Sequence, residues 1–159
     1  ELRAFRGLDF SRVYALGFSN GAALVHMLAA TRSHFRAHAA MATALIAGNE
    51  PGDDVHRASF LSVHGMDDVV CPYEGGPGRV RLNFLAAEAS AALWAEQLGC
   101  PSEADRSTTN EGNRRFVYAP CDDGHRVEHY GIAGSGHSIS RDSEGGLYNL
   151  IMTFFEETP

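Results

Sequence analysis

The sequence predicts an α/β protein with a mostly parallel β-sheet flanked by helices. Short, largely apolar runs of strand length, the first at residues 12–18, are typical of strands buried on both faces of a parallel sheet. They alternate with stretches in which apolar residues recur every three or four positions, as in amphipathic helices. The length of 159 residues and the 44% of hydrophobic residues are ordinary for a globular chain, so we expect residues 1–159 to form a single domain.

Three strand-like runs and one helix are predicted in the first half of the chain. Residues 12–18 (Arg-Val-Tyr-Ala-Leu-Gly-Phe) suit a buried strand, and a helix is expected from about Asn20 to Thr31, where apolar residues recur at helical spacing. Residues 39–47 are apolar throughout and of strand length, although their alanine and methionine content equally suits a helix. Residues 58–64 (Ala-Ser-Phe-Leu-Ser-Val-His) are the clearer strand.

A loop and the longest helix are predicted next. Residues 72–78 hold two prolines and three glycines and are expected to form a loop. The helix is expected from about Arg81 to Leu98. Residues 101–113 are polar, and we expect them to be the most mobile part of the domain. The apolar face of the helix would comprise Leu82, Leu85, Ala89, Ala92 and Leu93.

The last third of the chain is expected to complete the sheet and cover it. Two strand-like runs, residues 115–118 and 127–132, flank a turn at residues 122–124 (Asp-Asp-Gly). A closing amphipathic helix carries Leu147, Leu150, Ile151 and Phe154. The first strand begins near residue 12 with no element before it, so its outer edge is expected to be unpaired.

Charge and hydropathy argue against two classes of protein. The 13 basic and 20 acidic residues give a net charge of −7, which disfavours a nucleic-acid-binding protein because phosphate contacts need a basic face. No apolar run reaches the roughly 20 residues that span a bilayer, so no membrane span is expected. Three cysteines, Cys71, Cys100 and Cys121, allow one disulfide with one free thiol or three reduced thiols, and they lack the spacing of a structural zinc site.

The sharpest chemical signal is the G-x-S-x-G sequence at residues 17–21 (Gly-Phe-Ser-Asn-Gly), directly after a predicted strand and at the start of a predicted helix. An abrupt strand-to-helix turn forces the turn residue into a strained conformation, and the flanking glycines remove side chains that would collide there. Ser19 would then project its hydroxyl from the edge of the sheet as a nucleophile. The backbone N–H of Asn20 would face the developing oxyanion.

A serine nucleophile needs a base and an acid, which in this architecture follow in the order Ser, acid, His. The acid is expected in the loop after residues 58–64, where Asp67 and Asp68 both stand. The base is expected later, and His137 in the glycine-rich loop at residues 134–137 (Gly-Ser-Gly-His) has the right position. Other histidines lie in predicted helices or strands or away from such a loop. His34 and His38 have the i, i+4 spacing of metal ligands, but no third ligand accompanies them, so no metal site is predicted.

At these motifs the chain resembles an α/β-hydrolase, and more narrowly the secreted polyhydroxybutyrate depolymerase and feruloyl or acetylxylan esterase group. The resemblance covers nearly the whole chain. Residues 12–22 match the family's RVYVTGLSNGG strand and turn, and residues 64–73 match its HG-x-x-D-x-x-V-P-Y motif, which places the acid on Asp68. Trp94 and Cys100 match a W-x(5)-C helix ending, and residues 121–137 match a stretch that ends in G-x-G-H at His137.

The resemblance carries further expectations. It implies a disulfide between Cys100 and Cys121, hence an oxidising, extracellular or periplasmic location. It also implies that the N-terminal strands of the hydrolase fold, with one oxyanion donor, are missing from this chain, which would be the C-terminal portion of a larger hydrolase. Residues 138–141 (Ser-Ile-Ser-Arg) depart from the family's Thr-Trp-Pro-Gly, so the aromatic wall near the base differs.

The function implied is hydrolysis of carboxylic esters, of polyhydroxyalkanoate or of hydroxycinnamoyl or acetyl-polysaccharide type. Ser19, His137 and Asp68 would form a Ser-His-Asp triad that works through an acyl-enzyme and needs no cofactor. The substrate would be a small or polymeric ester, and the oligomeric state is not indicated. The alternatives are a non-catalytic, truncated hydrolase-like segment that binds a ligand or partner, and a serine peptidase or lipase on the same fold.

Overall fold

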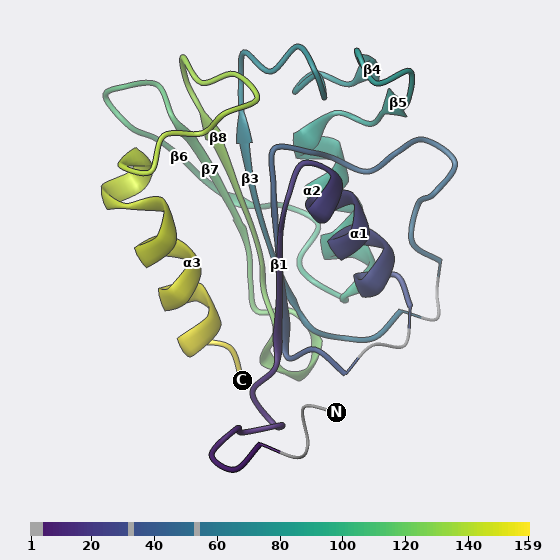
Figure 1. Ribbon diagram of the computed structural model, residues 1–159, viewed down its shortest axis with the longest axis vertical. Coiled ribbons are helices and arrows are strands. Elements are labelled where there is room, and N and C mark those ends of the chain that lie inside the picture. The colour runs from purple at the N-terminus through teal and green to yellow at the C-terminus, as the bar shows by residue number, and fades with distance from the viewer. Residues whose placement is uncertain (1–4, 32–33, 53–54) are drawn as a thin grey trace.

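A six-stranded, mostly parallel sheet with helices on both faces forms the body of the protein (Figure 1). The computed structural model describes residues 5–31, 34–52 and 55–159. The strand order is β1-β2-β3-β8-β7-β6. The first four strands run parallel, β7 runs antiparallel to β8, and β6 runs antiparallel to β7. The strands are β1 (Tyr14–Phe18), β2 (Ala37–Met41), β3 (Ser59–Gly65), β6 (Asp105–Thr108), β7 (Arg114–Tyr118) and β8 (Val127–Ile132).

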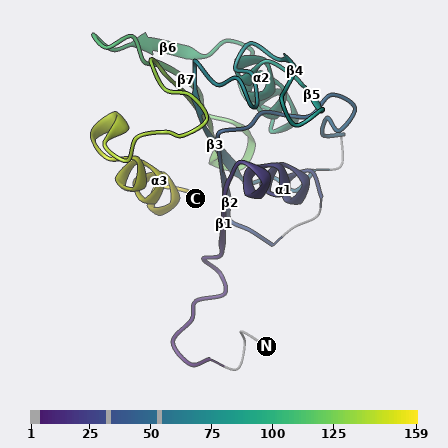
Figure 2. The same ribbon diagram turned by 45° about the horizontal axis from the view of Figure 1, so that its top comes forward.

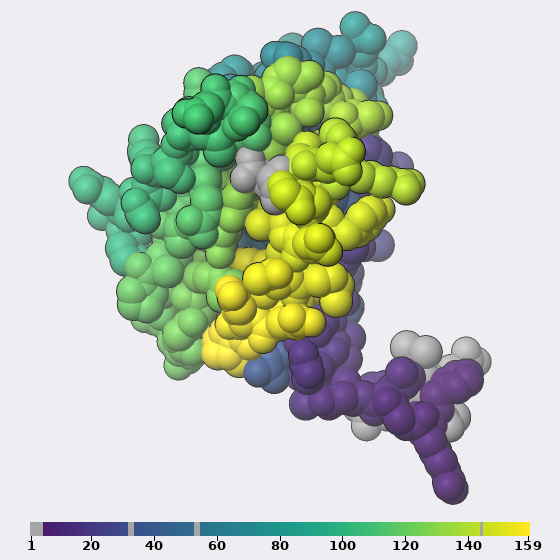
Figure 3. Space-filling view, turned by 90° about the vertical axis from the view of Figure 1, so that its left-hand side faces the viewer, coloured from purple at the N-terminus to yellow at the C-terminus, as the bar shows by residue number. Residues whose placement is uncertain are grey.

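In the described part of the chain, three α-helices cover the sheet from opposite sides (Figure 1). Helices α1 (Asn20–Ala29) and α2 (Ala87–Gln97) pack on one face, where Trp94 stacks on Phe60 with ring centroids 4.8 Å apart. Helix α3 (Leu147–Glu156) covers the other face, where Phe155 stacks on Tyr14 at 4.6 Å. In Figure 3, α3 (yellow) lies over the sheet beside the green segment of β6 and β7. The expectation of a mostly parallel sheet between helices is confirmed at this level.

Strand β2 settles the open choice for residues 39–47 only in part, because residues 39–41 are strand whereas residues 42–47 lie outside the named helices and strands. All five residues of β2 are buried, and the strand is hydrogen-bonded to β1 on one side and to β3 on the other. Its alanines have a packing reason. Ala37, Ala39 and Ala40 are at most 1% exposed, and such small side chains let helices approach a central strand closely from both faces.

The long helix expected from Arg81 begins later, at Ala87, so that boundary was wrong. Residues 83–84 instead form the short strand β5 (Asn83–Phe84), which pairs with β4 (Gly76–Pro77) inside the predicted loop. Backbone bonds across the fold hold this segment extended, because Leu85 N–H donates to the carbonyl of Leu45 at 2.8 Å. These long-range bonds outweigh the helical spacing of the apolar residues.

The polar segment 101–113, in which no strand was predicted, contains β6. This strand lies at the edge of the sheet in an antiparallel pair with β7, and all four of its residues are exposed. An exposed edge strand needs no apolar face, which explains why the sequence shows no strand pattern there.

The opposite edge of the sheet is β1, which pairs with β2 alone among the described residues. Leu16 and Phe18 are each 45% exposed on this strand. The preceding residues 5–13 lead away from the sheet without helix or strand (Figure 2). No helix in the described part of the chain has the length and apolar character to cross a membrane.

Candidate active site

Ser19 stands at the turn between β1 and α1 in a backbone conformation that serine seldom adopts. Its φ is 53° and its ψ −117°, in the positive-φ region that costs about 1–3 kcal/mol for residues other than glycine. The turn is tight, because a Cβ on Gly17 would overlap the backbone of Gly21. The sheet holds the strained residue in place, since Ser19 N–H donates to the carbonyl of Met41 at 2.9 Å.

Two loops bring an imidazole and a carboxylate to this hydroxyl. Ser19 Oγ lies 2.8 Å from Nε2 of His137, and Nδ1 of His137 lies 2.9 Å from Oδ2 of Asp68. A carboxylate can only accept, so Nδ1 carries the proton and donates to Asp68, which leaves Nε2 free to accept the Ser19 proton. We call these three residues the Ser19 cluster. They are separated by 49 and 69 positions of chain, but all follow the carboxyl ends of parallel strands, which share one edge of the sheet.

Asp68 is held as a charged, fully buried acceptor. Its side chain has no exposed surface, and its Oδ1 accepts the backbone N–H groups of Val70 at 2.8 Å and Cys71 at 3.0 Å. Burial alone would raise the pKa of Asp68. The hydrogen bonds from His137, Cys71 and Val70 outweigh burial and hold the pKa below its ordinary value. The neighbouring Asp67 is exposed.

The loop that carries His137 crosses directly over the end of β3. Gly65 is the last residue of that strand, and a Cβ there would collide with the carbonyl oxygens of Ser135 and Gly136. The two loops are also joined by a backbone bond, in which Asp67 N–H donates to the carbonyl of Ser135 at 2.9 Å. The absence of a side chain at position 65 therefore sets how closely the base approaches the acid.

Replacing Gly65 with alanine tests this close approach. The added methyl group must push the 134–137 loop outward, which moves His137 away from Ser19. We expect a loss of about 100-fold in kcat/KM, the cost typical of a 1 Å misplacement. Gly134→Ala is a control for loop rigidity, because a Cβ at Gly134 has no heavy atom within 4 Å, although its φ of 68° brings some backbone strain. A Gly65→Ala protein with full activity and an unchanged Tm would contradict this account of the loop.

Asn20 is the first residue of α1, so its backbone N–H has no acceptor within the helix. Asn20 directly follows Ser19 in the chain and lies at the positive end of the helix dipole, where a backbone N–H can stabilise a negative charge. Phe18, on the other side of Ser19, places its half-exposed ring 5.5 Å from the ring of His137.

Two further buried histidines, His26 and His129, make hydrogen bonds in the core. His26 accepts a hydrogen bond from the indole N–H of Trp94 at 3.0 Å, and burial lowers its pKa to about 3. His129 is bound to Ser62 and Tyr73 in the core, and burial lowers its pKa to about 3 as well. In the described part of the chain, no three His, Cys, Asp or Glu residues form a group that could hold a metal ion.

Sequence reasoning missed one residue at the site, His64. Its Nε2 lies 3.1 Å from Asp68 Oδ2 and 2.9 Å from the carbonyl oxygen of Cys71. The signal for it in the sequence is the position of His64 four residues before Asp68, as the first residue of the same HG-x-x-D motif.

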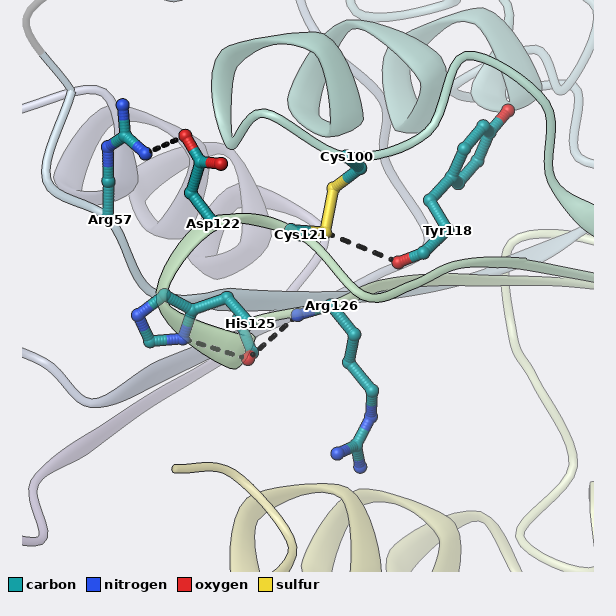
Figure 4. The surroundings of a disulfide bond; sticks show 8 residues. Arg57, Cys100, Tyr118, Cys121, Asp122, His125 and Arg126 are labelled. Carbon is teal, nitrogen blue, oxygen red and sulfur yellow. Dashed lines mark hydrogen bonds and ion pairs between the residues drawn. A yellow bond between two sulfur atoms is a disulfide. The ribbon is translucent and has the colours of Figure 1, made fainter.

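Cys100 and Cys121 form a disulfide bond (Figure 4). Cys71 is a buried free thiol. The bond joins the chain just after α2 to the turn that precedes β8. The same turn is held by an ion pair between Arg57 and Asp122, and by a bond from Asp122 N–H to the carbonyl of Leu98 at 3.1 Å. The disulfide thus connects the helix to the strand whose following loop carries His137.

Comparison with known proteins shows that the chain is similar in sequence to esterases. The chain is 26% identical, over its whole length, to a bifunctional acetylxylan esterase/xylanase of Neocallimastix patriciarum, and covers 23% of that protein. It is 30% identical over 86% of its length to a probable feruloyl esterase C of Aspergillus flavus, and covers 49% of it. A probable feruloyl esterase C of Aspergillus niger is 36% identical over 43% of the chain, and 25% of that protein is covered.

The chain is a distant homologue of feruloyl and acetylxylan esterases. No protein-family model matches the chain. The chain spans about half the length of the Aspergillus flavus relative and about a quarter of the other two.

Proposed function

We propose that this chain belongs to a serine hydrolase that cleaves carboxylic esters through an acyl-enzyme. The observation that carries the proposal is the unbroken path of hydrogen bonds from the Ser19 hydroxyl through His137 to Asp68, at 2.8 and 2.9 Å. The similarity to feruloyl and acetylxylan esterases supports it independently. The fold proposed is that of an α/β-hydrolase, in which a serine on a strained strand-to-helix turn is the nucleophile.

In the proposed mechanism, Ser19 attacks the ester carbonyl while His137 Nε2 takes the hydroxyl proton. The carbonyl oxygen becomes an oxyanion, which the backbone N–H of Asn20 stabilises. His137 then donates its proton to the leaving alcohol, and the acyl group stays on Ser19 until water, activated by the same imidazole, releases the acid. Asp68 fixes the tautomer of His137 and stabilises the imidazolium that forms in each step.

The substrate class proposed is an ester of a hydroxycinnamic or acetic acid on a polysaccharide, or a polyhydroxyalkanoate. The names of the relatives support the first two, and the half-exposed ring of Phe18 beside His137 offers an aromatic acyl group a surface to pack on. The disulfide supports an extracellular or periplasmic location, because such bonds persist in oxidising compartments.

Covalent labelling tests the proposal directly. A fluorophosphonate probe reacts with a serine only when a neighbouring base activates the hydroxyl. We expect stoichiometric labelling of Ser19 at pH 8, located by peptide mass spectrometry, in the longest natural polypeptide that contains these residues. Ser138, exposed and next to the base, is the internal control and stays unlabelled. Absence of labelling from a folded protein would favour a non-catalytic, ligand-binding role.

A further inference from the structure

His64 is a buried histidine next to the Ser19 cluster that the mechanism above does not use. It lies near the end of β3 and is 1% exposed. Its Nε2 faces two oxygens, the carbonyl of Cys71 at 2.9 Å and Oδ2 of Asp68 at 3.1 Å. Its other ring nitrogen, Nδ1, is buried and has no hydrogen-bond partner among the described residues.

These contacts determine where the proton of His64 sits. A carbonyl and a carboxylate are both acceptors, so Nε2 must be the protonated nitrogen and Nδ1 the bare one. Protonation of Nδ1 would bury an N–H group without an acceptor, which is costly. Burial accordingly lowers the pKa of His64, although Asp68 and the carbonyl of Cys71 oppose the effect. His64 is therefore a neutral donor with a fixed tautomer.

The contact with His64 also restrains the carboxylate of Asp68. Its Oδ1 accepts two backbone N–H groups, and its Oδ2 accepts both His64 Nε2–H and His137 Nδ1–H. The carboxylate thus receives four donors and has no freedom to rotate. The two imidazole N–H groups donate to the same oxygen and are attracted by the same negative charge, so each hydrogen bond weakens the other.

We propose that His64 is a positioning residue of the Ser19 cluster: its Nε2–H fixes the Asp68 carboxylate and limits the negative charge that Asp68 presents to His137. The inference rests on the proposed function, because its consequence is a change in how strongly His137 holds the proton that it takes from Ser19. Because His64 also donates to Asp68, the carboxylate stabilises the imidazolium form of His137 less than it would if His137 were its only side-chain donor.

The other titratable groups around His64 are neutral near pH 7, so they do not obscure the effect. Tyr73 packs its ring edge-on to His64 at 5.7 Å, and burial raises its pKa well above the ordinary value. Burial also raises the pKa of the Cys71 thiol. His26 on α1 and His129 on β8 have pKa values lowered by burial to about 3.

The test compares His64→Leu, which removes the donor, with His64→Gln, whose amide N–H can occupy the place of Nε2–H. The matched control is His129→Leu, the same substitution at a fully buried histidine of the adjacent strand that does not contact Asp68. The readout is the NMR titration of the His137 imidazole in histidine-labelled protein, which requires no enzymatic activity. The pH profile of kcat/KM is measured in parallel.

We expect His64→Leu to move the His137 titration midpoint upward by about 0.5 pH units, a threefold change in the ratio of the two forms. The acid limb of the pH profile should move with it. His64→Gln should keep the wild-type midpoint of His137. His129→Leu should lower Tm and leave the His137 midpoint unchanged. An unmoved midpoint in His64→Leu, or an equal shift in His129→Leu, would overturn the proposal.

A measurement on the unmodified protein covers the case in which His64→Leu does not fold. The ¹⁵N shifts of His64 should show a protonated Nε2 and a bare Nδ1 throughout the titration of His137. A His64 ring protonated at Nδ1 would refute the inference. Both NMR measurements are independent of the proposed hydrolysis. If the proposed function is wrong, only the labelling and turnover experiments would show it.

Discussion

Replacing Ser19 with alanine is expected to lower kcat for a p-nitrophenyl ester by about 10⁶-fold, the loss typical of removing a serine nucleophile. No other hydroxyl can replace it, because Ser19 Oγ is the group within 2.8 Å of His137 Nε2. The fold should tolerate the change, since the Ser19 side chain makes no other hydrogen bond within the described part of the chain and is only part-buried. Alanine would keep the strained φ of 53° and hence a Tm close to that of the wild type.

Initial rates with p-nitrophenyl acetate, measured in the longest natural polypeptide that contains these residues, provide the check. Ser138→Ala is the matched control, because Ser138 is exposed and adjacent to His137 in sequence. Its activity should remain within about twofold of wild type, as for most surface substitutions. Hydrolysis by Ser19→Ala at the wild-type rate would remove Ser19 from the mechanism.

Replacing Asp68 with asparagine should lower kcat by about 10⁴-fold at neutral pH, the effect of the wrong histidine tautomer in a triad. The amide oxygen of asparagine can keep the two backbone donors, Val70 and Cys71. Its NH₂ group then replaces Oδ2 and donates to Nδ1 of His137, so Nε2 becomes protonated and can no longer accept the Ser19 proton. The same NH₂ group faces His64 Nε2–H, which adds a repulsive donor–donor contact.

Asp67→Asn is the control for this change, because Asp67 is the adjacent carboxylate and is exposed. We expect it to retain full kcat, measured with the same ester. Asp68→Asn should also change the pH dependence of stability. The lowered pKa of Asp68 contributes stability above the ordinary carboxyl range, which is lost as the pH falls through the lower folded-state value. Equal losses of activity in both variants would show that the acid had been assigned to the wrong residue.

Local patterns in the sequence predicted the elements that depend on near neighbours. The strand-to-helix turn at Ser19 and the helix that follows it depend on glycines and apolar spacing within one stretch of chain. The same holds for β3, β8 and the closing helix α3. The boundaries that depended on distant partners were wrong, as in the start of α2, where the backbone of Leu85 is bound to Leu45 on another segment.

The sequence by itself indicated a serine, an acid and a histidine in the right order, each in a loop after a strand. It could not show their distances, because these depend on the alignment of parallel strands and on the close contact between Gly65 and the 134–137 loop. The family motif already placed the acid on Asp68, and the tertiary structure adds that Asp68 is buried whereas Asp67 is exposed. Only the structure revealed His64 as a second donor to the same oxygen. Motif spacing describes neighbours along the chain, whereas burial and shared hydrogen bonds arise when separate segments are packed together.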